Sequence, residues 1–136
     1  MLLEVVKKVN RLIEIKVYVK RDETGQLFFS HEESSEFLEV NAKFLSPGWK
    51  LSNHIESPAI SGILGLPQID RAKLYENRLK YLLKDWNLKD EYPLDFENDS
   101  DNFNKLTDES YEAIVGENGI DSKVINQFLI LLDERL

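Results

Sequence analysis

The sequence contains no cysteine, one methionine and two histidines among its 136 residues. Without cysteine the chain has no disulfide scaffold, no thiolate zinc site and no cysteine nucleophile. Its longest uninterrupted apolar run is the segment 128–132, far short of the roughly 20 residues that a membrane-spanning helix needs. Glu4, Lys7 and Lys8 stand where a signal peptide has an uninterrupted apolar run, so we expect a cytosolic protein without a membrane span.

The residues that are present describe a folded chain with an uneven charge. Hydrophobic residues make up 42% and charged residues 31%, which is typical of a soluble globular protein. The length suits one domain, because chains of about 150 residues bury roughly two-thirds of their unfolded surface. The net charge of −8 divides into +2 for residues 1–84 and −10 for residues 85–136. This acidity argues against direct binding of nucleic acid, which needs a basic surface.

The first 45 residues have the pattern of antiparallel β structure. From Ile13 to Val19 apolar and polar residues alternate, as they do in a strand with one buried face. Residues 22–25 have turn chemistry, which predicts a hairpin between Ile13–Arg21 and Gln26–Ser30. Alternation predicts another strand over Glu36–Phe44. The stretch Leu3–Val9 suits a strand or a short helix, and its β-branched residues favour a strand.

Residues 46–69 contain six glycines and prolines, so we expect a loop-rich segment. The segment is nevertheless apolar, and its large apolar residues are Trp49, Leu51, Ile55, Ile60, Ile63, Leu64 and Leu66. Two interpretations remain open. Either the segment folds back onto its own sheet, which we favour, or it docks on a partner.

The remaining residues, 70–136, predict helices. Asp70 is a candidate N-cap for a helix that runs to about Trp86 with an apolar stripe, and a polar, acidic linker follows to residue 104. Thr107 is placed to cap a short helix that ends at Val115, and Asp121 to cap the last helix. The predicted fold is therefore α+β in one domain, with N-terminal β-hairpins or a small sheet (1–45), the loop-rich segment (46–69) and about three helices (70–136).

Four carboxylates stand at alternate positions in the acidic stretch: Asp95, Glu97, Asp99 and Asp101. In a looped backbone such residues can converge on a hard cation such as calcium. A calcium loop counted from Asp95, however, would need glycine where Ser100 stands and glutamate where Leu106 stands. We therefore interpret the stretch as an exposed acidic surface and predict neither a metal site nor a cofactor.

The two histidines do not predict catalysis. His31 has no second histidine four residues later, so the metalloprotease spacing is missing. His54 is close in sequence to Glu56, but general acid–base catalysis depends on geometry that this spacing does not define. No serine lies in a Gly-x-Ser-x-Gly turn. We predict no catalytic residue and no enzyme activity.

The segment Tyr81–Glu91 ends in a Trp-Asn-Leu-Lys-Asp-Glu signature, and the extended Tyr92-Pro93-Leu94 follows it. Together with an acidic gap and two further predicted helices, this segment resembles small bacteriophage tail proteins, especially tail assembly chaperone-like and baseplate accessory proteins. The resemblance covers about residues 72–132. The chain departs from that pattern at Tyr92, where those proteins often have a glycine.

This resemblance implies a non-enzymatic protein that binds other phage tail or baseplate proteins, in the host-cell cytoplasm during assembly or in the virion. Homo-oligomerisation is left open. The residues that would contact a partner are the apolar members of the middle segment, an aromatic residue of the signature and one of the last helix: Trp49, Ile55, Ile60, Ile63, Leu64, Trp86 and Phe128. Trp86 also suits the core, which is the more common place for such a tryptophan.

The charge distribution supports an alternative function. A small acidic protein can inhibit a basic partner, as toxin immunity proteins and DNA mimics do, because a dense carboxylate surface attracts a cationic cleft. In that case the acidic surface Asp95, Glu97, Asp99 and Asp101 would contact the partner. The two interpretations differ in which part of the chain binds.

Overall fold

The computed structural model describes residues 11–29, 37–63 and 66–136. The strand expected over Leu3–Val9, and also His31 and Leu64, lie outside the described residues. The elements, in chain order, are β1 (Leu12–Arg21), β2 (Leu27–Phe29), β3 (Leu38–Leu45), α1 (Trp49–Glu56), a 3-10 turn η1 (Ser57–Ala59), β4 (Ile60–Ile63), β5 (Leu66–Ile69), α2 (Arg71–Leu82), β6 (Leu83–Trp86), β7 (Phe96–Asn98), β8 (Asn104–Leu106), α3 (Asp108–Val115) and α4 (Ser122–Asp133).

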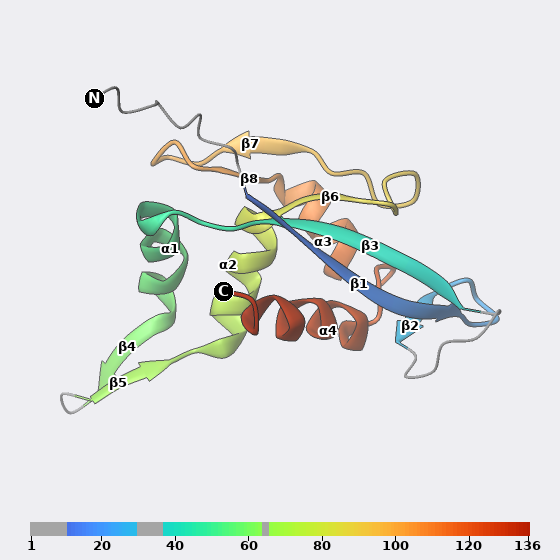
Figure 1. Ribbon diagram of the computed structural model, residues 1–136, viewed down its shortest axis with the longest axis horizontal. Helices are drawn as coiled ribbons and strands as arrows, with labels where there is room; N and C mark the ends of the chain where they lie inside the picture. Colours follow the sequence, from blue (N-terminus) through green and yellow to red (C-terminus); the bar gives the residue numbers. More distant parts are fainter. Residues whose placement is uncertain (1–10, 30–36, 64–65) are drawn as a thin grey trace, which may run out of the picture.

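The main sheet is antiparallel, with the strand order β2-β1-β3-β6 (Figure 1). The predicted hairpin is confirmed, because β1 pairs with β2 and Val19 lies opposite Phe29. Its turn depends on two residues. Asp22 accepts hydrogen bonds from the backbone N–H groups of Thr24 and Gln26, and Gly25 adopts a positive φ of 86°, a conformation that costs glycine little.

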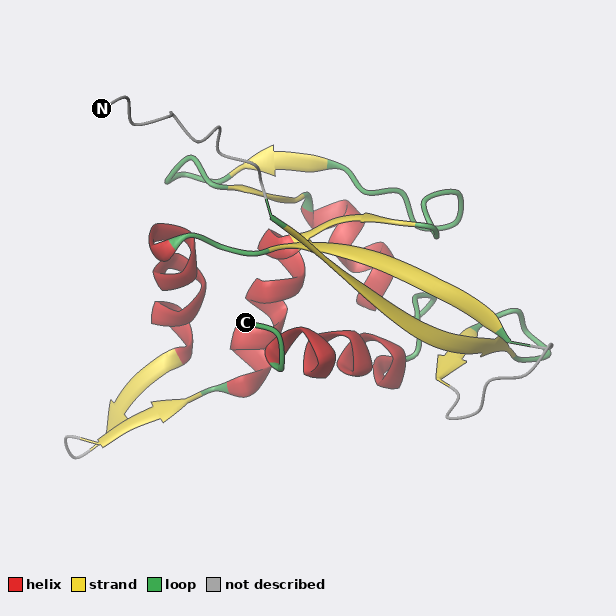
Figure 2. Ribbon diagram, viewed as in Figure 1, coloured by secondary structure: helices red, strands yellow, loops and turns green. Residues whose placement is uncertain are grey.

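The alternation in β1 and β3 buries one face of this sheet under the helices (Figure 2). Val19 and Val40 are fully buried, and the rings of Phe44 and Phe128 lie 6.2 Å apart between β3 and α4. Helix α4 packs against β1 and β2. Leu38, which the alternation assigns to the buried face, is 44% exposed because it lies at the first residue of β3.

Helix α2 begins as predicted but ends earlier. The carboxylate of Asp70 accepts a hydrogen bond from the backbone N–H of Lys73 at 3.1 Å, which is the expected N-cap. The helix stops at Leu82, and the next four residues form β6 instead of a last helical turn. They pair with β3, so that Trp86 lies opposite Ala42. This pairing gives hydrogen-bond partners to the edge of β3, which a longer helix would leave open.

The middle segment is more regular than expected. It contains the helix α1 and the hairpin β4–β5, because most of its prolines and glycines fall between or at the ends of short elements, while Gly62 and Pro67 pair with each other inside the hairpin. Pro47 and Gly48 precede α1, and Pro58 lies in the first turn of η1. The acidic linker is likewise partly regular, because it contains β7 and the first residue of β8.

The last two helices have the predicted caps. Thr107 accepts a hydrogen bond from the backbone N–H of Ser110, and Asp121 accepts one from that of Lys123. With strands first and helices later, the fold class is the predicted α+β. Within the described ranges, no helix has the length and apolar character needed to cross a membrane.

Candidate functional site

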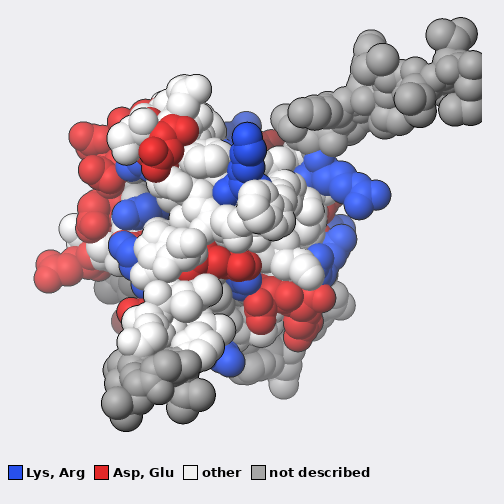
Figure 3. All heavy atoms as spheres, turned by 90° about the vertical axis from the view of Figure 1, so that its left-hand side faces the viewer, with Lys and Arg blue, Asp and Glu red and all other residues white. Residues whose placement is uncertain are grey.

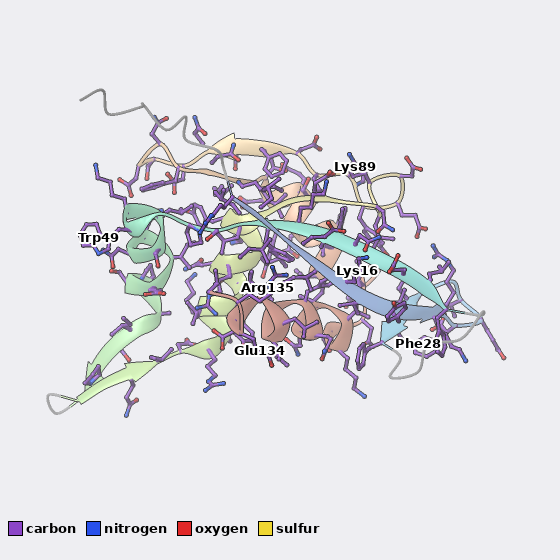
Figure 4. The ribbon with its side chains drawn as sticks, viewed as in Figure 1. Lys16, Phe28, Trp49, Lys89, Glu134 and Arg135 are labelled. Carbon is purple, nitrogen blue, oxygen red and sulfur yellow. The ribbon has the colours of Figure 1, made fainter. Side chains whose placement is uncertain are left out.

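The hairpin β4–β5 projects from the body of the molecule beside α1 (Figure 1). Three large apolar side chains in this region are exposed: Trp49 by 79%, Ile60 by 50% and Ile69 by 63%. We refer to these three residues as the apolar end. The side chain of Trp49 points away from the body (Figure 4), and much of the surface on this side of the molecule is uncharged (Figure 3). Trp49 and Ile69 are the two most exposed large apolar side chains of the described residues, and strongly exposed apolar groups can mark an interaction site.

A groove of about 290 Å³ lies between this hairpin and α2. Ile60 and Ile69 lie opposite each other in the hairpin and line one side of the groove, and Leu74 and Tyr75 of α2 also line it. Arg78 lines it as well and is buried. Its Nη1 donates a hydrogen bond to Oδ1 of Asp133 at 2.6 Å, so the guanidinium has a charged partner. Glu56 and Arg71 also line the groove, so it has charged as well as apolar walls. Its apolar part suits an apolar side chain of a partner.

The base of the hairpin is held firmly by the body. Ile55 and Ala59 are each 2% exposed. The side-chain amide of Asn77 in α2 donates a hydrogen bond to the carbonyl of Ile55, and the backbone N–H of Asp70 donates one to the carbonyl of Ala59 at 2.7 Å. These contacts hold the hairpin, with Ile60 and Ile69, in one orientation, so a partner would meet a preorganised surface there.

The residues expected to bind a partner divide into two groups. Trp49 and Ile60 are exposed as a binding role requires. The side chain of Ile63 and all of Leu64 are outside the described residues. The sequence analysis missed Ile69, whose position opposite Ile60 follows from the register of a hairpin that was not predicted.

The other three expected contact residues are in the core, and their assignment to a partner surface is corrected. Ile55 is 2%, Trp86 3% and Phe128 1% exposed. Trp86 is buried because β6 joins the sheet, and its indole N–H donates to the carbonyl of Tyr92. Ile55 faces α2 and Phe128 faces the sheet, so each stabilises the fold instead of contacting solvent.

A polar cluster joins α1, α2 and the turn between β7 and β8. Oδ2 of Asp99 accepts hydrogen bonds from His54 Nε2 at 2.7 Å and from the Tyr81 hydroxyl at 2.6 Å. Nδ1 of His54 is 3.7 Å from a carboxylate oxygen of Asp101, and the Phe103 ring packs on the imidazole with the ring centres 4.5 Å apart. No local sequence pattern predicts this cluster, since its members come from three separate segments.

The hydrogen bonds of this cluster control the ionisation of its carboxylate. Burial alone would raise the pKa of Asp99, but hydrogen bonds from Tyr81, the backbone N–H of Phe103, His54 and the backbone N–H of Asp101 outweigh it and lower the pKa to about 2. Burial and the same carboxylate raise the pKa of Tyr81. At neutral pH the Asp99 carboxylate is therefore negatively charged and the Tyr81 hydroxyl is neutral. Because both nitrogens of His54 face carboxylates of the β7–β8 turn, the cluster holds this turn against α1.

The acidic surface is less uniform than the sequence suggests. Asp95, Glu97 and Asp101 are exposed, whereas the Asp99 side chain is only 11% exposed. Glu97 lies 3.3 Å from the ammonium of Lys105, which reduces its negative field. In the described ranges no group of three or more potential ligands is arranged to hold a metal ion.

Comparisons with known proteins do not add a function. The chain matches no protein-family model, no curated protein and no solved structure.

Proposed function

We propose that this chain is a non-enzymatic bacteriophage protein that binds other tail components, either during tail or baseplate assembly or as a structural accessory of the virion. It would act in the host-cell cytoplasm during assembly or remain in the particle. The observation that carries the proposal is the apolar end: Trp49, Ile60 and Ile69 are half or more exposed on elements that the body holds in place. Burying such side chains against a partner is favourable by about 25 cal/mol per Å² of apolar surface.

The resemblance to phage tail proteins supplies the class of partner. The segment that carries it, Tyr81–Glu91, forms the end of α2, all of β6 and the turn that follows. Trp86 of this segment is buried, so the segment supports the fold that presents the apolar end. The acidic alternative lacks a comparable observation, because Asp99 is used internally and Glu97 is paired with Lys105.

The proposal is tested by affinity capture from cells in which the phage assembles its tails. The tagged chain should capture a tail or baseplate protein. A double variant, Ile60→Ser with Ile69→Ser, should lose at least about tenfold of this capture, because it removes apolar area from the contact. The matched control is Ile130→Ser on α4, whose isoleucine is 44% exposed on a different element. It should capture the same protein as the unchanged chain.

Two results would contradict the proposal. One is equal capture by the double variant and the control. The other is loss of capture when Asp95, Glu97 and Asp101 are replaced by their amides while the apolar end is unchanged, which would favour the acidic alternative.

A further inference from the structure

The strand β4 has an open edge. Its sheet has two strands, and within the described part of the chain β4 pairs only with β5. In an antiparallel ladder the pairs alternate between those that exchange hydrogen bonds and those that do not. The Asp70 N–H donates to the Ala59 carbonyl, so Ala59 and Asp70 form a hydrogen-bonded pair. Counting along the register, the Gly62–Pro67 pair does not exchange hydrogen bonds, in agreement with the missing N–H of proline. The N–H and C=O of Gly62 therefore point outward.

The two edges of the hairpin differ in their protection. On β5 the outward position opposite Gly62 is Pro67, which offers no N–H to an added strand. On β4 the corresponding position is a glycine, with no proline, lysine or bulge to discourage pairing. Proteins that avoid edge-to-edge association usually carry such protection. The β4 edge is thus a template for another strand.

The charge of the chain indicates which strand this is. Residues 57–69 form an uncharged stretch bounded by Glu56 and Asp70, in a chain with a net charge of −8. Two copies repel one another through their equal net charge, but their hairpins can meet without bringing charges together. The hairpin also projects from the body (Figure 1), so the charged bodies would stay apart in such a contact. At that separation salt screens the repulsion between them.

We propose that two copies of this chain associate through their β4 edges and form a four-stranded antiparallel sheet in the order β5-β4-β4-β5. A two-fold axis near Gly62 lets the same groups donate and accept in both copies, so the edge is complementary to itself. This association goes beyond binding of a tail component, because it uses backbone groups of β4 instead of the side chains of the apolar end.

Sedimentation equilibrium of the purified full chain tests the association. The apparent mass should rise with protein concentration from 15.8 kDa toward twice that value. It should rise at lower concentration when the salt is increased from about 0.05 to about 0.5 M, because screening weakens the repulsion between copies. A mass that stays at 15.8 kDa over the whole range would overturn the proposal.

Substitutions of Gly62 locate the contact. A Cβ at this position meets no atom within 4 Å, so alanine fits. Gly62→Pro removes the outward N–H and fixes φ, and it should weaken association at least about tenfold, whereas Gly62→Ala keeps the N–H and should stay within about twofold of the unchanged chain. Equal association of the two variants would overturn the proposal. Circular dichroism melting checks that both fold.

A charged variant provides a second test that does not depend on proline. Gly62→Asp keeps the N–H but brings two carboxylates together at the axis. Its association should be weakened at low salt and largely restored at high salt. Weakening that salt does not relieve would count against β4 pairing. The proposed function is tested by capture with the Ile60→Ser, Ile69→Ser variant, and the self-association by sedimentation. Either proposal can therefore fail without the other.

Discussion

At the scale of single residues, Asp99 differs from its neighbours in the acidic stretch. The sequence places Asp95, Glu97, Asp99 and Asp101 in equivalent alternate positions. The structure turns only the Asp99 side chain inward, where it joins α1, α2 and the β7–β8 turn. A carboxylate with several donors is stabilised as an anion and becomes a tether between the segments that supply the donors.

Replacing this carboxylate should destabilise the fold. We expect Asp99→Asn to lower the free energy of unfolding by about 1–3 kcal/mol, since the hydrogen bonds to a charged acceptor are weakened. Urea denaturation measures the change. Asp95→Asn is the matched control, because Asp95 is an exposed carboxylate of the same stretch outside the cluster, and it should change stability by less than about 0.5 kcal/mol. Equal effects of the two variants would contradict the tether.

The low pKa of Asp99 also predicts a dependence on pH. A carboxylate whose pKa is lower in the folded state than in the unfolded state stabilises the fold above the unfolded value, and this contribution is lost as pH falls through the folded value. For Asp99 the loss runs from about pH 4 to about pH 2. Tyr81→Phe removes one donor, so the pKa of Asp99 should rise toward its ordinary value.

Carboxyl chemical shifts followed by NMR during an acid titration measure this pKa directly. In the unchanged chain the Asp99 resonance should titrate near pH 2, and in Tyr81→Phe at a higher pH. An unchanged midpoint in the variant would show that the tyrosine hydroxyl does not stabilise the anion.

At the scale of elements, N-caps fix where the helices start. Asp70→Ala leaves a backbone N–H of the first turn of α2 without its partner and should cost about 1 kcal/mol of unfolding free energy. Thermal or urea unfolding measures it. Asp90→Ala, in the exposed turn after β6, removes the same charge without removing a cap and serves as the control. If both variants have the same stability, capping by Asp70 is refuted.

The elements that the sequence predicted well are those defined by local chemistry. Alternation placed β1 and β3, and side-chain caps placed the starts of α2, α3 and α4. The end of α2 was missed because the apolar residues Leu79, Leu82, Leu83 and Trp86 suit a helical stripe equally well. Only pairing with β3, some forty residues earlier in the chain, makes Leu83–Trp86 a strand. Such a contact leaves no local signal.

The candidate site was predicted in part for the same reason. Trp49 and Ile60 are exposed, and their contact with a partner stays a prediction. Ile55 stands in the same stretch but is buried, and nothing in the sequence around it separates it from its neighbours. His54 and Asp99 are 45 positions apart, so their contact follows only from the packed elements.

At the scale of the whole molecule, the apolar end and the acidity occupy different segments. The apolar end lies on α1 and the hairpin, before residue 70, whereas the net charge of −10 belongs to residues 85–136. Under the proposed function the apolar end contacts the partner and the acidic part opposes nonspecific association. The Asp99 cluster connects the two, since it fastens the β7–β8 turn to α1.

Hydrogen–deuterium exchange of the chain, free and in complex with the captured tail component, tests this division most directly. The account predicts slower exchange on binding in residues 49–63 and 66–69, with little change in residues 95–101. Slower exchange confined to residues 95–101 would contradict it and would identify the acidic stretch as the binding surface.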